Sequence, residues 1–247
     1  MLGVPERVEA CLFDMDGVLT QTAGLHAEAW KQTFDEFLRE RAGRQGERLD
    51  PFDEHGDYDR YVDGRPRADG VRSFLASRGI ELPQGGADDP PGKPTIAGLG
   101  ERKNELLLER IAREGVQAYD GSVAYVRAAR AGGLRCAVVS ASVNTARVLE
   151  AAGLEGLFDA VIDGRVAADQ HLHGKPAPDT YLAGARALGV EPGAGAVYED
   201  ALAGVEAGRA GGFALVVGVD RVGQARALRE HGADIVVDDL AELIDAQ

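Results

Sequence analysis

Cysteine is scarce in this sequence, which has only two such residues among 247. Cys11 and Cys136 both lie inside apolar runs, VEACLF and LRCAVVS. In such runs we expect them to be small buried hydrophobic residues and not a redox pair. This pattern excludes a disulfide framework of the kind that holds small secreted domains together. A reducing compartment fits, so we expect a cytoplasmic protein.

Basic residues are also few, with 27 Lys and Arg against 41 Asp and Glu, which gives a formal net charge of −14. Nucleic acids and anionic membranes bind proteins that present a basic face. We therefore expect no nucleic-acid partner and no membrane partner. The sequence opens without a signal-peptide pattern, and no apolar stretch approaches the roughly 20 residues that a membrane-spanning helix needs.

In place of long apolar runs the sequence has several short ones. Continuous apolarity over a few residues indicates strands that are buried on both faces of a parallel sheet. Helical patterns follow three of these runs, at residues 144–152, 179–188 and 201–210. This alternation predicts an α/β fold with a doubly wound parallel sheet and a Rossmann-like core. The predicted strands are 8–13, 134–140, 194–198, 213–219 and 233–237.

Residues 24–116 interrupt that alternation. They contain helical patterns, no convincing strand, and a loop rich in Gly and Pro at 83–100. We therefore predict a helical cap domain, 24–116, inserted into an α/β catalytic core domain formed by 1–23 and 117–247. Ligands bind such sheets at the carboxyl ends of the strands, so we expect the cap to act as a lid over that edge. Its predicted helices are 26–41, 70–77 and 101–114.

Polar side chains follow the predicted strands at the points where the strands end. The carboxyl ends of parallel strands share one edge, so these side chains should meet there. Four carboxylates at one edge require a cation, and oxygen ligands of this type suit Mg²⁺. A hydroxyl, a lysine and the start of a helix beside them favour a phosphoryl group, with an aspartate placed to attack it. The residues concerned are Asp14, Asp16, Ser140, Lys175, Glu199 and Asp200.

Other interpretations of these residues exist. Asp16 and Gly17 form a dipeptide that is common in turns, and Lys175 could be a solvated loop charge. Gly174 and Lys175 do not form a P-loop, because proline follows where Ser or Thr is required. Glu199 or Asp200 could instead stabilise the start of the following helix by their charge.

Four motifs in the same order resemble those of the haloacid dehalogenase superfamily of phosphotransferases. They are DMDGVLT (14–20), SAS (140–142), GKPAPD (174–179) and YEDALAGVEA (198–207). The cap segments TAGLHAEAW (22–30) and RKN (102–104) are most similar to the β-phosphoglucomutase-like subfamily, whose members have a helical cap. The resemblance extends over essentially the whole chain.

The resemblance implies a role for each core residue. Asp14 would be the nucleophile that forms an aspartyl-phosphate, and Asp16 the general acid–base. Mg²⁺ would be held by Asp14, the backbone carbonyl of Asp16, and Asp200, with Glu199 in the same cluster. Two further side chains, Ser140 and Lys175, would hold the oxygens of the phosphoryl group. Such a reaction depends on positioning and on positive charge, because negative charge spreads over the phosphoryl oxygens in the transition state.

The cap residues are carried over in the same way. His26 matches a cap histidine near the acid–base aspartate, and Arg67 matches an arginine that grips a distal phosphate. Arg65 is a rival for that role, and either arginine could be a solvated charge. The pattern S-A-S-K-N of well-known mutases is Ser140-Ala141-Ser142-Val143-Asn144 here, so a lysine is replaced by Val143. Ser142 and Asn144 remain as neutral donors to the substrate, although Ser142 could instead cap a helix.

The implied function is Mg²⁺-dependent phosphoryl transfer on a small sugar phosphate, as a mutase that interconverts β-glucose 1-phosphate and glucose 6-phosphate. A phosphatase for a small phosphorylated sugar is the alternative, with water as the acceptor. A signalling receiver domain that carries a phosphoaspartate is a remote third alternative, because such domains lack an insert of this size. Nothing in the sequence specifies an oligomeric state, and a monomer is compatible with it.

Overall fold

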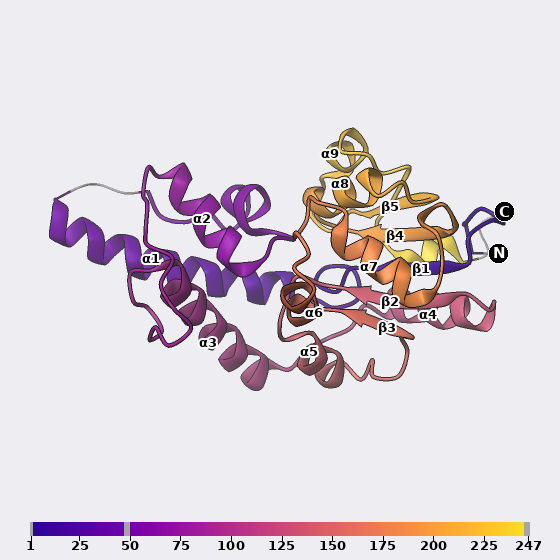
Figure 1. Cartoon of the computed structure of the whole chain (residues 1–247), viewed down its shortest axis with the longest axis horizontal. Helices are drawn as coiled ribbons and strands as arrows, with labels where there is room; N and C mark the ends of the chain where they lie inside the picture. Colours follow the sequence, from indigo (N-terminus) through magenta and orange to yellow (C-terminus); the bar gives the residue numbers. More distant parts are fainter. Residues whose placement is uncertain (1, 47–49, 245–247) are drawn as a thin grey trace. The chain divides into compact units, whose positions relative to one another are not determined.

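The computed structural model describes residues 2–46 and 50–244 (Figure 1). The chain divides into two compact units. The first consists of Met1–Gln21 and Val116–Gln247, and the second of Thr22–Gly115. The boundaries predicted from the sequence lie after residues 23 and 116, within two residues of these.

The first unit is built on a six-stranded parallel sheet with the strand order β3-β2-β1-β4-β5-β6. The predicted α/β fold is thus confirmed. The sheet contains one strand that the sequence analysis missed, β3, which is only three residues long. The strands are β1 (Ala10–Phe13), β2 (Arg135–Val139), β3 (Ala160–Ile162), β4 (Gly195–Glu199), β5 (Leu215–Val219) and β6 (Ile235–Val237).

Six α-helices accompany this sheet in the described residues 2–21 and 116–244. The helix predicted over 179–188 is present with those bounds. Pro178 precedes it, and Gly189 ends it in the left-handed conformation, with φ 67°. The helices are α4 (Asp120–Ala131), α5 (Thr145–Ala151), α6 (Gly164–Asp169), α7 (Asp179–Leu188), α8 (Leu202–Ala210) and α9 (Ala225–Glu230). Two 3₁₀ turns, η2 (Pro192–Ala194) and η3 (Leu240–Leu243), complete the unit.

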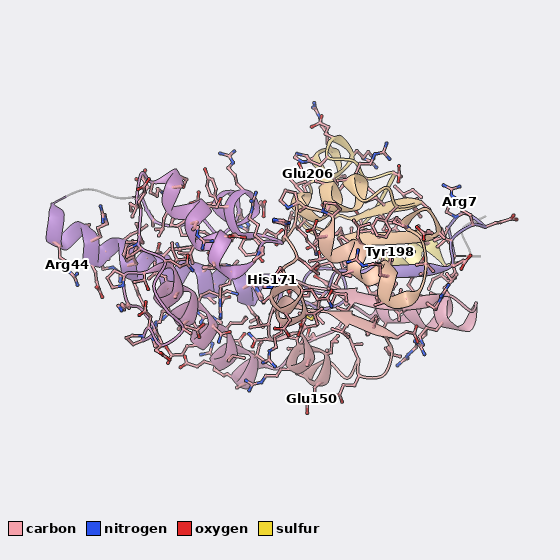
Figure 2. The ribbon with its side chains drawn as sticks, in the orientation of Figure 1. Arg7, Arg44, Glu150, His171, Tyr198 and Glu206 are labelled. Carbon is pink, nitrogen blue, oxygen red and sulfur yellow. The ribbon has the colours of Figure 1, made fainter. Side chains whose placement is uncertain are left out.

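Side chains alternate between the two faces of the sheet, and this alternation orients the residues at the strand ends. Leu12 of β1 and Val197 of β4 belong to the core cluster that includes residues of α7 and α8. Phe13 and Tyr198 face the other way, stack on each other at 4.5 Å and meet Tyr125 of α4. Figure 2 labels Tyr198 within the sheet. Residues two positions beyond Leu12 and Val197 therefore emerge on the side of α7 and α8.

The second unit is helical. It contains α1 (Ala23–Gln45), one π-helical turn, η1 (Tyr58–Val62), α2 (Arg67–Ser77) and α3 (Ile96–Glu114), and no strand among its described residues 22–46 and 50–115. Its core is aromatic. Phe34 packs against Phe74 with ring centroids 4.1 Å apart, and against Trp30 at 5.0 Å and Phe52 at 5.3 Å. This unit therefore has a hydrophobic core of its own.

Of the helices in 2–46 and 50–244, none is both long and apolar enough to cross a lipid bilayer.

Candidate active site

The turn after β1 brings its two aspartates to the edge of the sheet. The backbone N–H of Asp14 donates to the carbonyl of Tyr198 at 2.9 Å, which aligns the end of β1 with the end of β4. The chain then turns at Gly17, which has φ +84°. A Cβ atom on Gly17 would lie 1.8 Å from Asp200 Oδ2, so only glycine fits between this turn and that carboxylate.

Lys175 connects the ends of the two central strands. Its Nζ forms ion pairs with Asp14 Oδ1 and, at 2.5 Å, with Glu199 Oε1. The same Nζ donates to the carbonyl of Val139 at 3.3 Å. Burial alone would lower the pKa of Lys175, but the attraction of the two carboxylates outweighs it and raises the pKa above its ordinary value. The lysine, which is only 3% exposed, thus carries its positive charge inside the protein.

Asp14 lies in an environment that opposes its ionisation. Burial raises the pKa of this carboxyl well above its ordinary value, and Lys175 offsets the rise only in part. The neighbouring charges of Glu199 and Asp16 raise it further. A carboxylate in such surroundings is typical of a site that binds a cation or a reacting group.

Glu199 is held from three sides. Its Oε1 accepts from the hydroxyl of Tyr181 at 2.8 Å as well as pairing with Lys175, and its Oε2 accepts from the backbone N–H of Ala201 at 3.1 Å. A Cβ atom on Gly204 of α8 would lie 1.7 Å from Oε1, so this helix approaches the carboxylate through a glycine. The side chain is completely buried, and its position is fixed by these contacts.

Three of the predicted carboxylates come together. One oxygen from each of Asp14, Glu199 and Asp200 lies within 4.8 Å of the others, and all three residues are buried. When all three carboxyl groups are ionised, the single charge of Lys175 balances only one of their negative charges, and buried charge without compensation is costly. The cluster is therefore compatible with a divalent metal ion. The carboxylate of Asp16, which is half-buried, is not part of this group.

Ser140 organises the loop between β2 and α5. It is 2% exposed, and its Oγ accepts from the backbone N–H of Ser142 at 3.1 Å. Ser142 repeats the pattern, since its Oγ accepts from the N–H of Asn144 at 3.1 Å. A hydroxyl that accepts through its oxygen keeps its proton for donation. The loop thus presents two hydroxyl donors, and Asn144 is buried beside them.

The predicted cap residues lie in the second unit, each with a partner there. His26 Nδ1 is 3.1 Å from Nζ of Lys103, a buried lysine that also lies over the ring of Trp30. Arg67 pairs with Glu101 at 2.7 Å, and burial lowers the pKa of Arg67.

Sequence reasoning selected neither Lys103 nor Glu101 as a site residue, although RKN (102–104) was noted as a motif. It also missed Tyr181. The only sequence signal for Tyr181 is its place two residues after the start of α7, close behind the Lys175 loop.

The sequence matches a known protein family and is similar to curated proteins. Residues 8–212 match the family described as haloacid dehalogenase-like hydrolase. The chain is 56% identical over 247 residues to a β-phosphoglucomutase of Mycobacterium bovis, a match that covers 99% of this chain and 94% of that protein.

Solved structures show the same fold. A crystal structure of β-phosphoglucomutase from Clostridium difficile superposes with a TM-score of 0.72 at 24% identity, covering 96% of this chain and 93% of that one. CbbY from Rhodobacter sphaeroides, solved in complex with phosphate, superposes with a TM-score of 0.70 at 26% identity and covers 96% of each chain.

Proposed function

The chain belongs to the haloacid dehalogenase-like hydrolase family, and from that premise we propose that it acts as a Mg²⁺-dependent β-phosphoglucomutase. In this role it would interconvert β-glucose 1-phosphate and glucose 6-phosphate. The observation that carries the proposal is the 56% identity to a β-phosphoglucomutase over 99% of the chain. The buried cluster of Asp14, Lys175, Glu199 and Asp200 supports it with a suitable set of side chains.

Asp14 is the proposed nucleophile. One of its oxygens bonds to the phosphorus of the substrate while the bond from phosphorus to the sugar oxygen breaks, which leaves an aspartyl-phosphate. Asp16 donates a proton to the departing sugar oxygen and later takes one from the attacking hydroxyl. General acid–base catalysis of this type contributes about 10²–10⁴-fold to rate.

Lys175 and Ser140 are the proposed donors to the phosphoryl oxygens. Both are buried and fixed in place, so they can stabilise the charge on the phosphoryl group without reorganising. Mg²⁺ would be held by Asp14, Asp200 and the backbone carbonyl of Asp16, and when bound would supply positive charge against the phosphoryl oxygens. Glu199 already accepts from Tyr181, Ala201 and Lys175, so we assign it to positioning that cluster.

The residues proposed to bind the rest of the substrate are His26, Arg67, Ser142 and Asn144. Of the two candidate arginines we favour Arg67, because Glu101 fixes its guanidinium at 2.7 Å. The domain assignment is part of the same proposal, with the sheet-based unit as the catalytic core and the helical unit as the cap. A cytoplasmic location also remains a proposal, consistent with two free buried cysteines.

The decisive experiment supplies purified protein with Mg²⁺, β-glucose 1-phosphate and a catalytic amount of glucose 1,6-bisphosphate, and measures glucose 6-phosphate. We expect turnover that Asp14→Asn abolishes. Asp234→Asn is the matched control, because Asp234 caps the backbone N–H of Val216 and pairs with Arg209 outside the proposed site. Absence of glucose 6-phosphate with the wild-type protein would refute the mutase proposal.

A phosphatase is the second candidate, and one observation favours it. Val143 stands where the resemblance leads us to expect a lysine, so one cation for a second phosphate is missing. In this reaction water, in place of a sugar hydroxyl, takes the phosphoryl group from Asp14. Steady release of inorganic phosphate from sugar monophosphates, without isomerisation, would support this candidate. The signalling module is set aside, because the family is one of hydrolases.

A further inference from the structure

The loop that follows β5 is held rigidly by its first residue. The carboxylate of Asp220 accepts four backbone N–H groups of the loop: those of Val222 at 3.2 Å, Gly223 at 2.7 Å, Gln224 at 2.8 Å and Ala225 at 2.8 Å. A turn with so many bonds to one side chain has little freedom. It can therefore serve as a fixed base for the side chains that project from it.

Arg221 projects from this loop onto the turn that follows Asp16. Its Nε donates to the carbonyl of Gly17 at 2.9 Å. Its Nη1 donates to the carbonyl of Asp238 at 2.7 Å and lies 3.5 Å from the carboxylate of Asp239. The guanidinium also lies 3.6 Å from the ring centroid of Tyr119. A planar fork that bonds in its plane and stacks on a ring fixes both partners in orientation.

The same loop also holds the turn after β4. Gln224 Nε2 donates to the carbonyl of Asp200 at 3.0 Å. Gly17 in turn packs directly against the carboxylate of Asp200. One rigid loop thus supports the backbone beside Asp16, after β1, and the backbone of Asp200, after β4.

Tyr119 extends these contacts to the segments that lead into and out of the second unit. Its N–H donates to the carbonyl of Leu19 at 3.0 Å, and the N–H of Gln21 donates to the carbonyl of Gln117 at 2.8 Å. The chain leaves the first unit after Gln21 and returns to it at Val116. By contacting Gly17 and Tyr119, Arg221 fastens both segments to the sheet-based unit.

We propose that Arg221 is a positioning residue that holds the Gly17 turn, and with it Asp16, in register with Asp200. This role rests on the proposed function, in which Asp16 transfers protons and Asp200 serves the metal site. Arg221 itself touches none of the reacting atoms in this scheme. Its loss should therefore slow the chemical step and leave substrate binding largely intact.

The test compares Arg221→Met and Arg221→Lys with Arg130→Met. Arg130 is a matched control, because it too holds a backbone carbonyl, that of Leu157 at 2.9 Å, and a carboxylate, that of Asp159 at 3.0 Å. Backbone hydrogen exchange is measured in residues 14–21 and 116–121, and kcat and KM are measured for β-glucose 1-phosphate. Thermal melting verifies that each variant is folded.

We expect Arg221→Met to accelerate exchange in both segments and to lower kcat about 10–100-fold, as for other residues that orient a metal site, with little change in KM. Arg221→Lys should fall in between, since it keeps the charge without the planar fork. Arg130→Met should match wild type in both readouts.

Two results would overturn the inference. The first is that folded Arg221→Met exchanges its backbone hydrogens in these segments at the same rate as the wild-type protein. The second is that the kcat of Arg221→Met equals that of Arg130→Met. An inactive wild-type protein would refute the proposed function instead, and the exchange data would then decide by themselves whether Arg221 holds the turn.

Discussion

At the scale of single residues, Lys175 dominates the electrostatics of the site. It pairs with Asp14 and Glu199 in an environment where all three side chains are buried. Removing the partner of a buried charge is far more costly than removing a surface ion pair, because the remaining charge is left without compensation. The lysine therefore stabilises the fold, in addition to its proposed role as a donor to the phosphoryl oxygens.

Lys175→Met should lower the free energy of unfolding by about 3–5 kcal/mol in the absence of metal. Added Mg²⁺ should restore part of the loss by compensating the buried carboxylate charge that the lysine no longer neutralises. Urea unfolding with and without Mg²⁺ measures both effects. As a control, Lys93→Met removes the ion pair of an exposed lysine with Asp89 and should cost at most about 1 kcal/mol. Equal losses for the two variants would contradict this account.

The buried cysteines make the protein sensitive to alkali. Burial raises the pKa of Cys11 from 9.0 to about 11 and that of Cys136 from 9.0 to about 12. A pKa that is higher in the folded state stabilises the fold fully below the unfolded value, and this contribution disappears as pH rises toward the folded value. Each thiol should therefore cost about 1 kcal/mol of stability per pH unit above 9.

The measurement compares the wild-type protein with a Cys11→Ala, Cys136→Ala double variant between pH 8 and about 10.5, using urea unfolding. The stability of the wild-type protein should fall more steeply with pH. The tyrosines contribute to the pH dependence of stability in both proteins, so their contributions largely cancel in the difference. Parallel curves would show that the thiols ionise equally well in the folded and unfolded states.

The convergence of the core residues could be predicted from the sequence, and their supporting contacts could not. Asp14 directly follows β1, and Glu199 is the last residue of β4. These strands are parallel neighbours, so strand order alone brings the two residues together. Lys175 precedes the helix that packs beside those strands. Tyr181 and Arg221, by contrast, reach the site because of how α7 is rotated and how a loop 204 residues from Gly17 folds back. No local pattern encodes such contacts.

At the scale of elements, the fit of α8 against β4 controls the acidic cluster. Gly204 and Gly208 face the sheet, and Gly204 leaves space for the carboxylate of Glu199. The helix can approach β4 closely because these positions lack a Cβ atom. A side chain at Gly204 must displace Glu199 from Tyr181 and Lys175.

Gly204→Ala should therefore weaken Mg²⁺ affinity and activity, although alanine favours helix formation over glycine by about 1 kcal/mol. Gly43→Ala in α1 is the control, because a Cβ atom there meets nothing within 4 Å. It should leave activity unchanged and raise stability by up to about 1 kcal/mol. Metal titration and steady-state kinetics measure the difference, and a fully active Gly204→Ala would show that Glu199 can move freely.

Five of the six strands and several helices, among them α7, could be predicted from their patterns, whereas β3 and three helices of the sheet-based unit could not. The strands of the central sheet and α7 follow directly from their sequence. β3 was missed because Asp159 and Asp163 flank an apolar run of only three residues, Ala160–Ile162. α4, α6 and α9 were also missed. α6 and α9 have only six residues each, so their helical state depends on packing against the sheet more than on their own pattern. α4 has 12 residues and was missed for another reason, since its segment was not recognised as helical.

At the scale of the whole molecule, the two units have separate hydrophobic cores. The sheet-based unit packs apolar residues of β1, β2 and β4 against α7 and α8, and the helical unit packs its aromatic residues together. The sequence has a single tryptophan, Trp30, which is buried in the helical unit. The Asp14, Glu199 and Asp200 cluster belongs to the other unit.

Tryptophan fluorescence should consequently report the unfolding of the helical unit, whereas circular dichroism reports both units. Mg²⁺ binds to the folded sheet-based unit in our proposal, so at about 100 times its Kd it should stabilise that unit by about 2.7 kcal/mol. We expect the dichroism transition to move to higher urea concentration more than the fluorescence transition does. If the two transitions coincide and shift together, the units unfold as one.

The hydrogen bond between Gln21 and Gln117 has a consequence for how such a chain can change over evolutionary time. Excising the residues between them would leave two ends that are already adjacent, so a short peptide could rejoin them at a small cost in loop-closure entropy. Inserts of different length and composition could therefore replace one another between Gln21 and Gln117 without changing the sheet-based unit. The substrate could diversify in this way while the chemistry at the end of β1 stays the same.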